Sequence, residues 1–198
     1  RETALRPEIV DLARLLNELR NPVAKMVGED INLTITAAAD LRPVRIDQAM
    51  MQQAIMNLIV NARDAMPAGG ELTVRARNIQ LTAEEAVHYP GAAVGPYVLL
   101  EVIDTGIGMD EETLERIFDP FFTTKDVDKG TGLGLPMVQG FVDQSQGFIR
   151  VDSRPHCGTT IAILLPPSEE PVPTPTERPP KTPEVSDRPA TILVVEDE

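Results

Sequence analysis

The chain has 198 residues, of which 42% are apolar, so it can form one ordinary domain with a buried core and an appendage. Its 18 basic and 31 acidic residues give a net charge of −13. That charge argues against nucleic acid or an anionic membrane as the main partner, although a nucleotide needs only a local pocket. No apolar run approaches the length of a transmembrane helix. A single cysteine, Cys157, excludes an internal disulfide and is typical of a reducing compartment.

Periodicity and punctuation predict a mixed α/β body. Asp47 and Asp110 stand where helix N-caps are expected. The predicted helices are 7–26, whose end Pro22 should weaken, 47–65, 111–117 and 133–144. The predicted strands are 31–36, 44–46, 71–79, 97–104, 147–152 and 159–164, with a loop at 80–96.

The C-terminal part has a different composition. Nine of the 18 prolines fall between Pro166 and Pro189, among Glu, Thr and Ser residues, which predicts an extended linker. The stretch from Ala190 to Glu198 is a short apolar strand followed by acids, and a strand cannot fold alone. We therefore expect a globular domain at 1–166, a linker at 167–189 and the first strand of a truncated second domain at 190–198.

The helix after Asp47 has no charged residue from Gln48 through Ala62, whereas a surface helix normally carries charges on its outer face. One side is a predicted core stripe of Met51, Ile55, Leu58 and Ala62. The other side carries Gln53, Asn57, Asn61 and Asp64. Amides one turn apart can hold a divalent cation and phosphate oxygens without adding charge, and a solvated polar face is the alternative.

Two glycine-containing motifs follow. In the first, Asp104 ends a predicted strand, where its carboxylate can accept a hydrogen bond from a purine amine, and Gly106 and Gly108 let the backbone approach the ring. An ordinary Asp-Gly turn is the alternative. The second, Gly130 to Leu135, opens a helix and predicts a phosphate site of exposed backbone N–H groups, with a flexible turn as the alternative. It has neither the Walker nor the Rossmann spacing.

Aromatic residues gather at Phe118–Phe122, directly before Thr123, Thr124 and Lys125. Lys125 is placed to meet a terminal phosphate. We expect the three phenylalanines to pin a loop onto the core.

These motifs together resemble those of a known family. Asn57–Asp64 (NLIVNARD), Asp104–Met109 (DTGIGM), Phe118–Phe122 (FDPFF) and Gly130–Leu135 (GTGLGL) are similar, in order and spacing, to the N, G1, F and G2 boxes of the sensor histidine kinase ATP-binding domain. The resemblance covers about residues 5–166. The tail from Ile192 resembles the first strand and acidic pair of a receiver domain, so the chain is similar to part of a bacterial hybrid histidine kinase.

The resemblance implies the Bergerat fold of the GHKL superfamily. This is an α/β two-layer sandwich of a mixed sheet with helices on one face and a mobile ATP lid, here about residues 110–131. The implied cofactors are ATP and Mg²⁺. By motif, Asn57 faces the phosphates as the catalytic position, Asn61 coordinates Mg²⁺, Asp104 binds the adenine amine, and Thr159, or else Thr160, lies beside that acid. The other implied nucleotide-binding residues are Asp64, Ala65, Gly106, Gly108, Met109, Thr123, Thr124, Lys125, Gly130, Thr131, Gly132, Leu133, Gly134 and Leu135.

Two departures from the family pattern bear on function. Many members carry an aromatic residue or a lysine just after the second asparagine, whereas Arg63, Asp64 and Ala65 follow it here. The two histidines, His88 and His156, lie beside prolines in a predicted loop and turn, and we expect both to be ordinary surface residues. The acceptor histidine is therefore expected on a dimerisation and histidine phosphotransfer domain of the same protein, together with its receiver domain.

The implied function is an ATP-binding module that presents the γ-phosphate to a histidine outside this chain, and we do not expect the fragment to phosphorylate itself. A gyrase- or chaperone-like ATPase is a weaker alternative, because Asn57 stands where those relatives carry a glutamate. A non-catalytic module that senses a nucleotide or cyclic di-GMP is the other. We expect a cytoplasmic location, with no contact to nucleic acid or membrane by this fragment and any membrane anchor in a region N-terminal to it.

Overall fold

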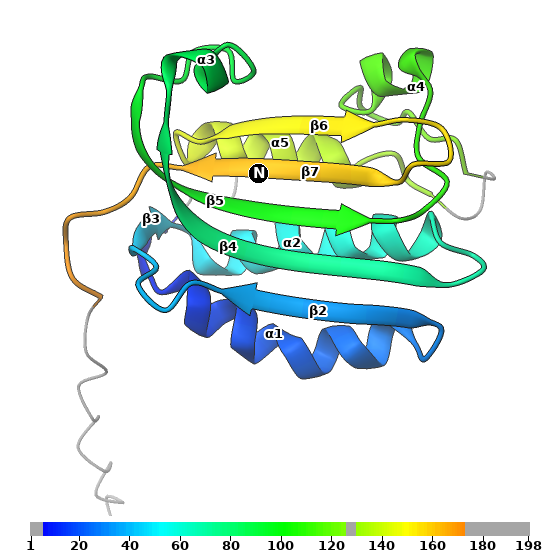
Figure 1. The fold of residues 1–198 in the computed structure, drawn as a ribbon, viewed down its shortest axis with the longest axis horizontal. Helices are drawn as coiled ribbons and strands as arrows, with labels where there is room; N and C mark the ends of the chain where they lie inside the picture. The colour runs from blue at the N-terminus through cyan, green and yellow to red at the C-terminus, as the bar shows by residue number, and fades with distance from the viewer. Residues whose placement is uncertain (1–5, 126–129, 173–198) are drawn as a thin grey trace, which may run out of the picture.

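The computed structural model describes residues 6–125 and 130–172 (Figure 1). The expected linker from residue 173 onward and the expected strand at 190–198 lie outside the described residues. So do residues 126–129 of the expected lid.

A five-stranded sheet forms one layer of the domain (Figure 1). In spatial order its strands are β2 (Ile31–Ala37), β4 (Gly70–Leu81), β5 (Gly95–Asp104), β7 (Thr159–Leu165) and β6 (Phe148–Ser153). β2 and β4 are parallel, and the other neighbours are antiparallel. The predicted mixed sheet is thus confirmed.

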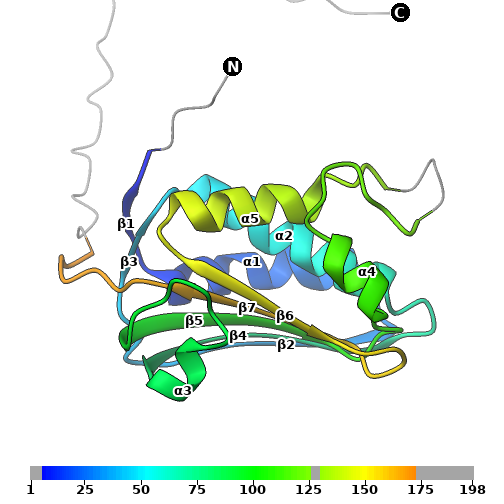
Figure 2. The ribbon, with the colours of Figure 1, turned by 90° about the horizontal axis from the view of Figure 1, so that it is seen from above.

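Three helices cover one face of this sheet, and Figure 2 shows them as the second layer. They are α1 (Leu12–Val27), α2 (Gln48–Asp64) and α5 (Gly134–Gln144). The short helix α4 (Glu111–Arg116) lies near one end of the sheet, and α3 (Ala83–Ala86) lies on the side away from the helical layer. The predicted two-layer α/β architecture is confirmed.

The core lies between the two layers. The predicted stripe of α2 is buried, with Met51, Ile55, Leu58 and Ala62 each at most 3% exposed. It packs in one cluster with the inward-facing residues Leu72, Val74, Leu100, Val102 and Ile163 of the sheet. Asp47 caps α2 by accepting a hydrogen bond from the Met50 N–H at 3.0 Å, as predicted.

The first predicted helix is wrong at its N-terminal end. Residues Glu8–Val10 form strand β1, which pairs antiparallel with β3 (Val44–Ile46). The helix begins only at Leu12, because Asp11 is its cap and accepts from the Arg14 N–H at 3.0 Å. Pro22 lies inside α1, which continues to Val27, and Val23 and Val27 of this last part are buried.

The predicted loop at 80–96 is shorter and more ordered than its punctuation suggested. β4 extends to Leu81, β5 starts at Gly95, and α3 between them is closed by a capping box of Thr82 and Glu85. Tyr89, which follows α3 in this connection, packs against the face of the sheet that the three helices do not cover. There it forms a second small core with Leu81, Leu99, Ala162 and Leu164.

The chain leaves β7 along the β1–β3 ribbon. Pro167 bridges to Val44, and the Ser168 N–H donates to the Pro43 carbonyl at 2.7 Å. Contact with the body therefore continues past Pro166. Within the described ranges, none of the helices is both long and apolar enough to cross a membrane.

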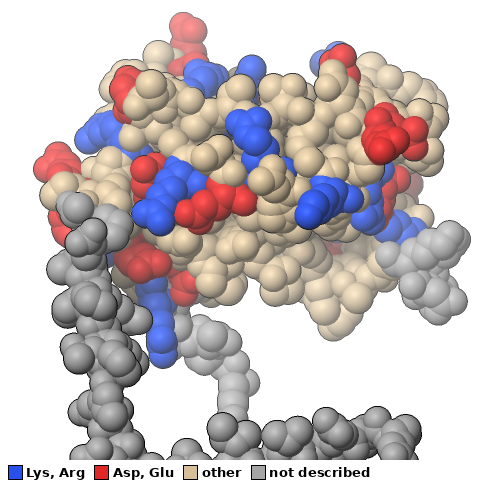
Figure 3. All heavy atoms as spheres, turned by 90° about the horizontal axis from the view of Figure 1, so that it is seen from below, with Lys and Arg blue, Asp and Glu red and all other residues tan. Residues whose placement is uncertain are grey.

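Figure 3 views the molecule from the side of β2 and α1, where basic and acidic side chains are interspersed. Arg14 and Glu18 pair one turn apart at 2.9 Å, and the Arg20 guanidinium donates to the Ile35 carbonyl at 2.7 Å. Both basic side chains thus have local partners.

The buried stripe of α2 should carry a large share of the stability. Ile55→Ala removes a side chain that is 1% exposed, so we expect the free energy of unfolding to fall by about 2–5 kcal/mol in urea denaturation. Gln52→Ala, on the exposed side of the same helix, is the control and should change it by less than about 0.5 kcal/mol. Similar losses in the two variants would contradict this packing.

Candidate functional site

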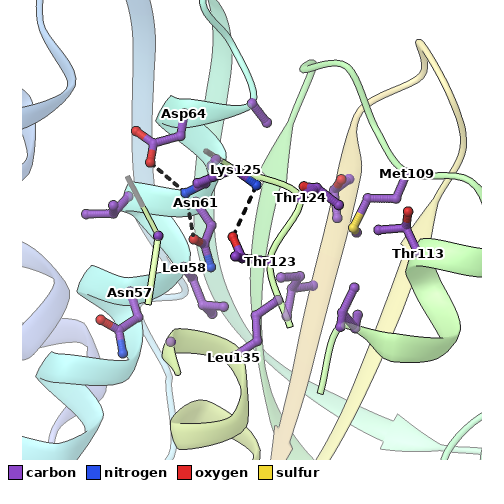
Figure 4. Close-up of a pocket in the computed structure, with 18 of the residues that line it drawn as sticks. Asn57, Leu58, Asn61, Asp64, Met109, Thr113, Thr123, Thr124, Lys125 and Leu135 are labelled. Carbon is purple, nitrogen blue, oxygen red and sulfur yellow. Dashed lines mark hydrogen bonds and ion pairs between the residues drawn. The ribbon is translucent and has the colours of Figure 1, made fainter. Parts of the chain in front are cut away.

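A pocket of about 490 Å³ opens between α2, the end of β5, α4 and the chain from Phe122 to Pro136 (Figure 4). The predicted site residues that line it are Asn57, Asn61, Asp64, Ala65, Asp104, Gly108, Met109, Thr123, Thr124, Lys125, Gly130, Thr131, Gly132, Gly134, Leu135 and Thr159. Two predicted residues lie elsewhere. Gly106 is buried behind Asp104, and Leu133 is the N-cap of α5.

Asp104 is the buried acid of the pocket, with only 7% of its surface exposed. Its Oδ1 accepts from the Gly106 N–H at 2.8 Å and the Thr159 N–H at 3.3 Å. Burial raises the pKa of this carboxyl, against the smaller lowering effect of these two bonds. No hydrogen bond within the described residues uses Oδ2, so that oxygen can accept from a ligand.

The glycines after Asp104 serve close packing of the protein itself. A Cβ on Gly106 would lie 2.5 Å from the Ala65 carbonyl oxygen, and the neighbouring Ile107 N–H donates to that same oxygen at 2.9 Å. Gly108 has φ +64°, and a Cβ there would collide with the Arg154 carbonyl. The turn is therefore pressed against the end of α2 and the β6–β7 connection, a close approach different from the predicted one to a ring.

The amide side of α2 faces the start of α5. A Cβ on Gly134 would lie 3.9 Å from Asn61 Nδ2 and 4.0 Å from Asn57 Cβ. Gln53 Nε2 donates to Asn57 Oδ1 at 3.3 Å, so two of the amides also bond along the helix. This uncharged face thus lines a pocket, which disfavours the alternative of a merely solvated surface.

Charge enters the pocket at the end of α2 (Figure 4). Lys125 Nζ lies 2.6 Å from Asp64 Oδ2 and 3.4 Å from Asn61 Oδ1. Arg63 Nη2 donates to Asp64 Oδ1 at 2.6 Å. Burial by itself raises the pKa of Asp64, but the bonds from Lys125 and then Arg63 outweigh it, so the pKa is lowered and the group stays ionised at neutral pH.

The phenylalanines divide between two roles. Phe122 lines the pocket, with the Arg116 guanidinium 4.3 Å from its ring centre. Phe121 is 75% exposed, so the expectation that all three rings pin a loop to the core is wrong for this residue. Its backbone is held instead, because its N–H donates to the Gly132 carbonyl at 2.9 Å and a Cβ on Gly132 would clash with that backbone.

Sequence reasoning missed the apolar walls of the pocket. These are Val102, Ile107, Ile117 and Ile161, among others. Strand alternation could have found two of them, because Val102 and Ile161 each lie two residues from a predicted site residue on the same strand, Asp104 and Thr159. Ile117 reaches the pocket only through the path of the chain around α4.

Neither histidine lines the pocket, although the His156 backbone N–H donates to the carbonyl of Ile107 in the pocket wall at 2.7 Å. His88 is exposed after α3, and His156 is exposed in the β6–β7 connection with φ +62°. No group of three or more His, Cys, Asp or Glu side chains in the described parts of the chain could hold a metal ion.

The mixed sheet, the helices on one face and the pocket between α2 and the glycines of α5 define an ATP-binding domain of the GHKL type. Residues 46–169 match the family described as histidine kinase-, DNA gyrase B- and HSP90-like ATPase. The chain belongs to this family. The curated relatives and the solved structures described below, which it resembles, are sensor histidine kinases.

Relatives support that assignment. Sensor kinase CckA of Brucella abortus (strain 2308) is 46% identical over 205 residues, covering all of this chain and 22% of that protein. Sensor histidine kinase ZraS of Escherichia coli (strain K12) is 34% identical over 165 residues, covering 83% of this chain and 32% of that protein. The chain thus spans about a fifth to a third of the length of these relatives.

Solved structures agree in fold. The mycobacterial sensor histidine kinase MprB matches with a TM-score of 0.63 and 27% identity, over 82% of this chain and 98% of that one. Full-length ShkA in complex with AMPPNP matches with a TM-score of 0.64 and 25% identity, over 88% of this chain and 33% of that one.

Because the pKa of Asp104 is raised, we expect replacement of this carboxyl to increase the stability of the fold by an amount that depends on pH. The native protein keeps this proton to higher pH than the unfolded chain does, so the group's protonation stabilises the fold fully below the ordinary pKa of 3.8 and that stability is lost as pH rises through the native pKa. We expect Asp104→Asn, which keeps an oxygen acceptor, to have the larger free energy of unfolding at neutral pH. The advantage over wild type should shrink as the pH falls toward 3.8 in denaturation series.

Asp143→Asn is the matched control, because it neutralises an exposed acid on α5. It should change the free energy of unfolding at pH 7 by less than about 0.5 kcal/mol. An Asp104→Asn protein less stable than wild type at pH 7 would contradict this account of the buried carboxylate.

Proposed function

We propose that this chain binds Mg²⁺-ATP in the pocket and presents the γ-phosphate to a histidine on a dimerisation domain elsewhere in the same protein. The observation that carries the proposal is Asp104, a buried carboxylate with one oxygen left for a ligand donor on the wall of a pocket whose far side is neutral amide. The ShkA structure, which holds the ATP analogue AMPPNP, supports it through its similar fold.

The base of the nucleotide belongs at Asp104. A carboxylate accepts from the exocyclic amine of adenine, and the low exposure of Asp104 strengthens that bond by keeping water away. Thr159, whose N–H already donates to the acid, keeps its carboxylate oriented. Apolar side chains at Met109, Ile117 and Ile161 provide the walls against which a planar base can pack.

The phosphates belong between α2 and the start of α5. Gly130, Gly132 and Gly134 leave backbone exposed there, and Leu133 provides no side-chain cap, so N–H groups at the start of α5 are open to an anion. Asn57 and Asn61 face this end without adding charge.

The residues present are compatible with Mg²⁺, which takes oxygen ligands and usually keeps phosphates and waters among them. Asn61 Oδ1 is the oxygen that would hold it. When bound, the ion would neutralise phosphate charge. Asn57 lies at the reacting end, and because an amide cannot take a proton at neutral pH, the site has no general base there to activate water. This favours transfer to a separate nucleophile over hydrolysis.

Partner domains follow from the reaction. Phosphoryl transfer needs a nucleophile held in line with the γ-phosphate, and the exposed His88 and His156 are not among the residues that line the pocket. We therefore assign the acceptor to a dimerisation and phosphotransfer domain, with a receiver domain as the later acceptor. The comparisons favour this kinase module over the sensing module and the hydrolysing ATPase.

Asp104→Ala tests the base-binding role. Loss of a charge-assisted hydrogen bond should lower the affinity for Mg²⁺-ATP by about 1.5–3 kcal/mol, which calorimetric titration measures. Asp143→Ala, at an exposed position on α5, is the control and should bind as wild type does. Unchanged ATP affinity in Asp104→Ala would refute the assignment.

Transfer of label tests the reaction itself. Incubation of this chain with γ-labelled ATP should leave it unlabelled and release phosphate slowly, because the pocket lining holds no histidine and its carboxylate nearest the amides, Asp64, is paired with Lys125 and Arg63. Addition of a dimerisation domain with its phosphorylatable histidine should restore labelling on that domain. Stable label on His88 or His156 would show that the acceptor has been misassigned.

A further inference from the structure

Lys125 carries the only positive charge among the described residues that line the pocket. A nucleoside triphosphate brings several negative charges to a protein whose net charge is already −13. The position and the present partners of this one ammonium group therefore bear directly on how the phosphates are received.

Lys125 makes contacts through its backbone, its side-chain stem and its ammonium group (Figure 4). Its backbone N–H donates to Thr123 Oγ1 at 3.1 Å. Its stem lies against Gly130, where an added Cβ would come within 3.3 Å of Lys125 Cβ and Cδ. Its Nζ contacts Asp64 at 2.6 Å and Asn61 at 3.4 Å. The head is thus drawn onto α2 across the phosphate end of the pocket.

Asn61 makes this placement consequential, because its Oδ1 is the oxygen proposed above for Mg²⁺. An ammonium group and a divalent ion at the same oxygen repel each other. Arrival of the metal with its nucleotide therefore favours departure of Lys125 from Asn61. Asp64 tolerates that departure, because Arg63 donates to its other oxygen at 2.6 Å and goes on compensating its charge.

We propose that Lys125 is a resident cation, held by Asp64 at the metal and phosphate end of the pocket before nucleotide binds, and that Mg²⁺-ATP binding transfers its ammonium from Asp64 and Asn61 to a phosphate oxygen. The proposal rests on the nucleotide site proposed above and assigns two residues within it. Lys125 contacts phosphate in the bound state. Asp64 is a positioning residue that acts through Lys125 and competes with the nucleotide for it.

The exchange is sterically simple. The lysine stem has four rotatable carbons, and its ammonium group can bond in any of three directions, so a change of partner needs no movement of α2. Breaking the ion pair between Lys125 and Asp64 offsets part of the binding free energy that the new contact with phosphate contributes. Removal of the carboxylate charge should therefore strengthen nucleotide binding, the opposite of what a direct ligand of the nucleotide or its metal would show.

Calorimetric titration of Mg²⁺-ATP into four variants tests this exchange. Lys125→Met should weaken binding about ten- to a hundredfold, the effect of losing a charged hydrogen bond, and Lys125→Arg should retain most of the affinity. Asp64→Asn should tighten binding severalfold in the wild-type background and leave it unchanged in the Lys125→Met background. A gain in affinity that depends on Lys125 cannot arise from a damaged fold.

Arg14→Met is the control, because it also removes the basic partner of a carboxylate, that of Glu18, but does so outside the pocket lining. It should change ATP affinity by less than about threefold. Weaker binding in Asp64→Asn, or an equal effect of Asp64→Asn with and without Lys125, would overturn the exchange.

The same titrations separate the two proposals. A wild-type chain that does not bind ATP would overturn both the proposed function and the exchange. A wild-type chain that binds ATP and loses affinity in Asp104→Ala, while Lys125→Met binds as wild type does, would overturn the exchange alone.

Discussion

The packing of α2 against the sheet determines where every polar group of the pocket lies. Its buried stripe of Met51, Ile55, Leu58 and Ala62 fixes the rotation of the helix about its axis. With about 100° between successive residues, Asn57, Asn61 and Asp64 must then point away from the sheet. They meet the start of α5 and the chain before it, so the second side of α2 lines a pocket. This explains why the helix carries amides where a surface helix carries charges.

The second constraint is the burial of Asp104, which opposes stability. A carboxylate that is 7% exposed and bonded by two backbone N–H groups retains acceptor capacity that the fold leaves unused. Its raised pKa records the cost of keeping it there. Such a group is expected where function, rather than folding, selects the residue. A ligand that donates a hydrogen bond to the carboxylate recovers part of the free energy that its burial costs. The glycine turn that follows supports it by bringing the chain against α2 and the β6–β7 connection.

Local patterns predicted the elements that depend on local physics. The capped and uncharged α2, the strand ending at Asp104 and the helix opened by glycines were all evident in short windows of the sequence. Predictions failed where distant pairing decided the structure. Glu8–Val10 has no strand signature of its own and is extended because β3, more than 30 residues away, pairs with it. The capping box of Thr82 and Glu85 was a local signal that proline and glycine punctuation obscured.

The same distinction holds within the site. Sixteen of the 18 predicted site residues line the pocket, because motifs preserve spacing along α2 and the glycine turns. The contact between Asp64 and Lys125 joins residues 61 positions apart, and no periodicity links them. The sequence placed both residues at the site and could not say that they touch. Their pairing follows only from the path of the chain between α4 and α5.

An acidic protein can receive a polyanion because its charges are compensated locally. Charges farther away than about 8 Å are largely screened at physiological salt, so the net charge of −13 acts weakly at the pocket. Close to the phosphate end, Asp64 is shared between Arg63 and Lys125, and the remaining polar groups are neutral amides and backbone. Asp104 is the other carboxylate of the pocket, and we propose that it serves the uncharged base. The site therefore has little fixed charge at the end where we place the phosphates. This suits a ligand that brings its own cation, and the ammonium group of Lys125 remains free to change partners when that ligand binds.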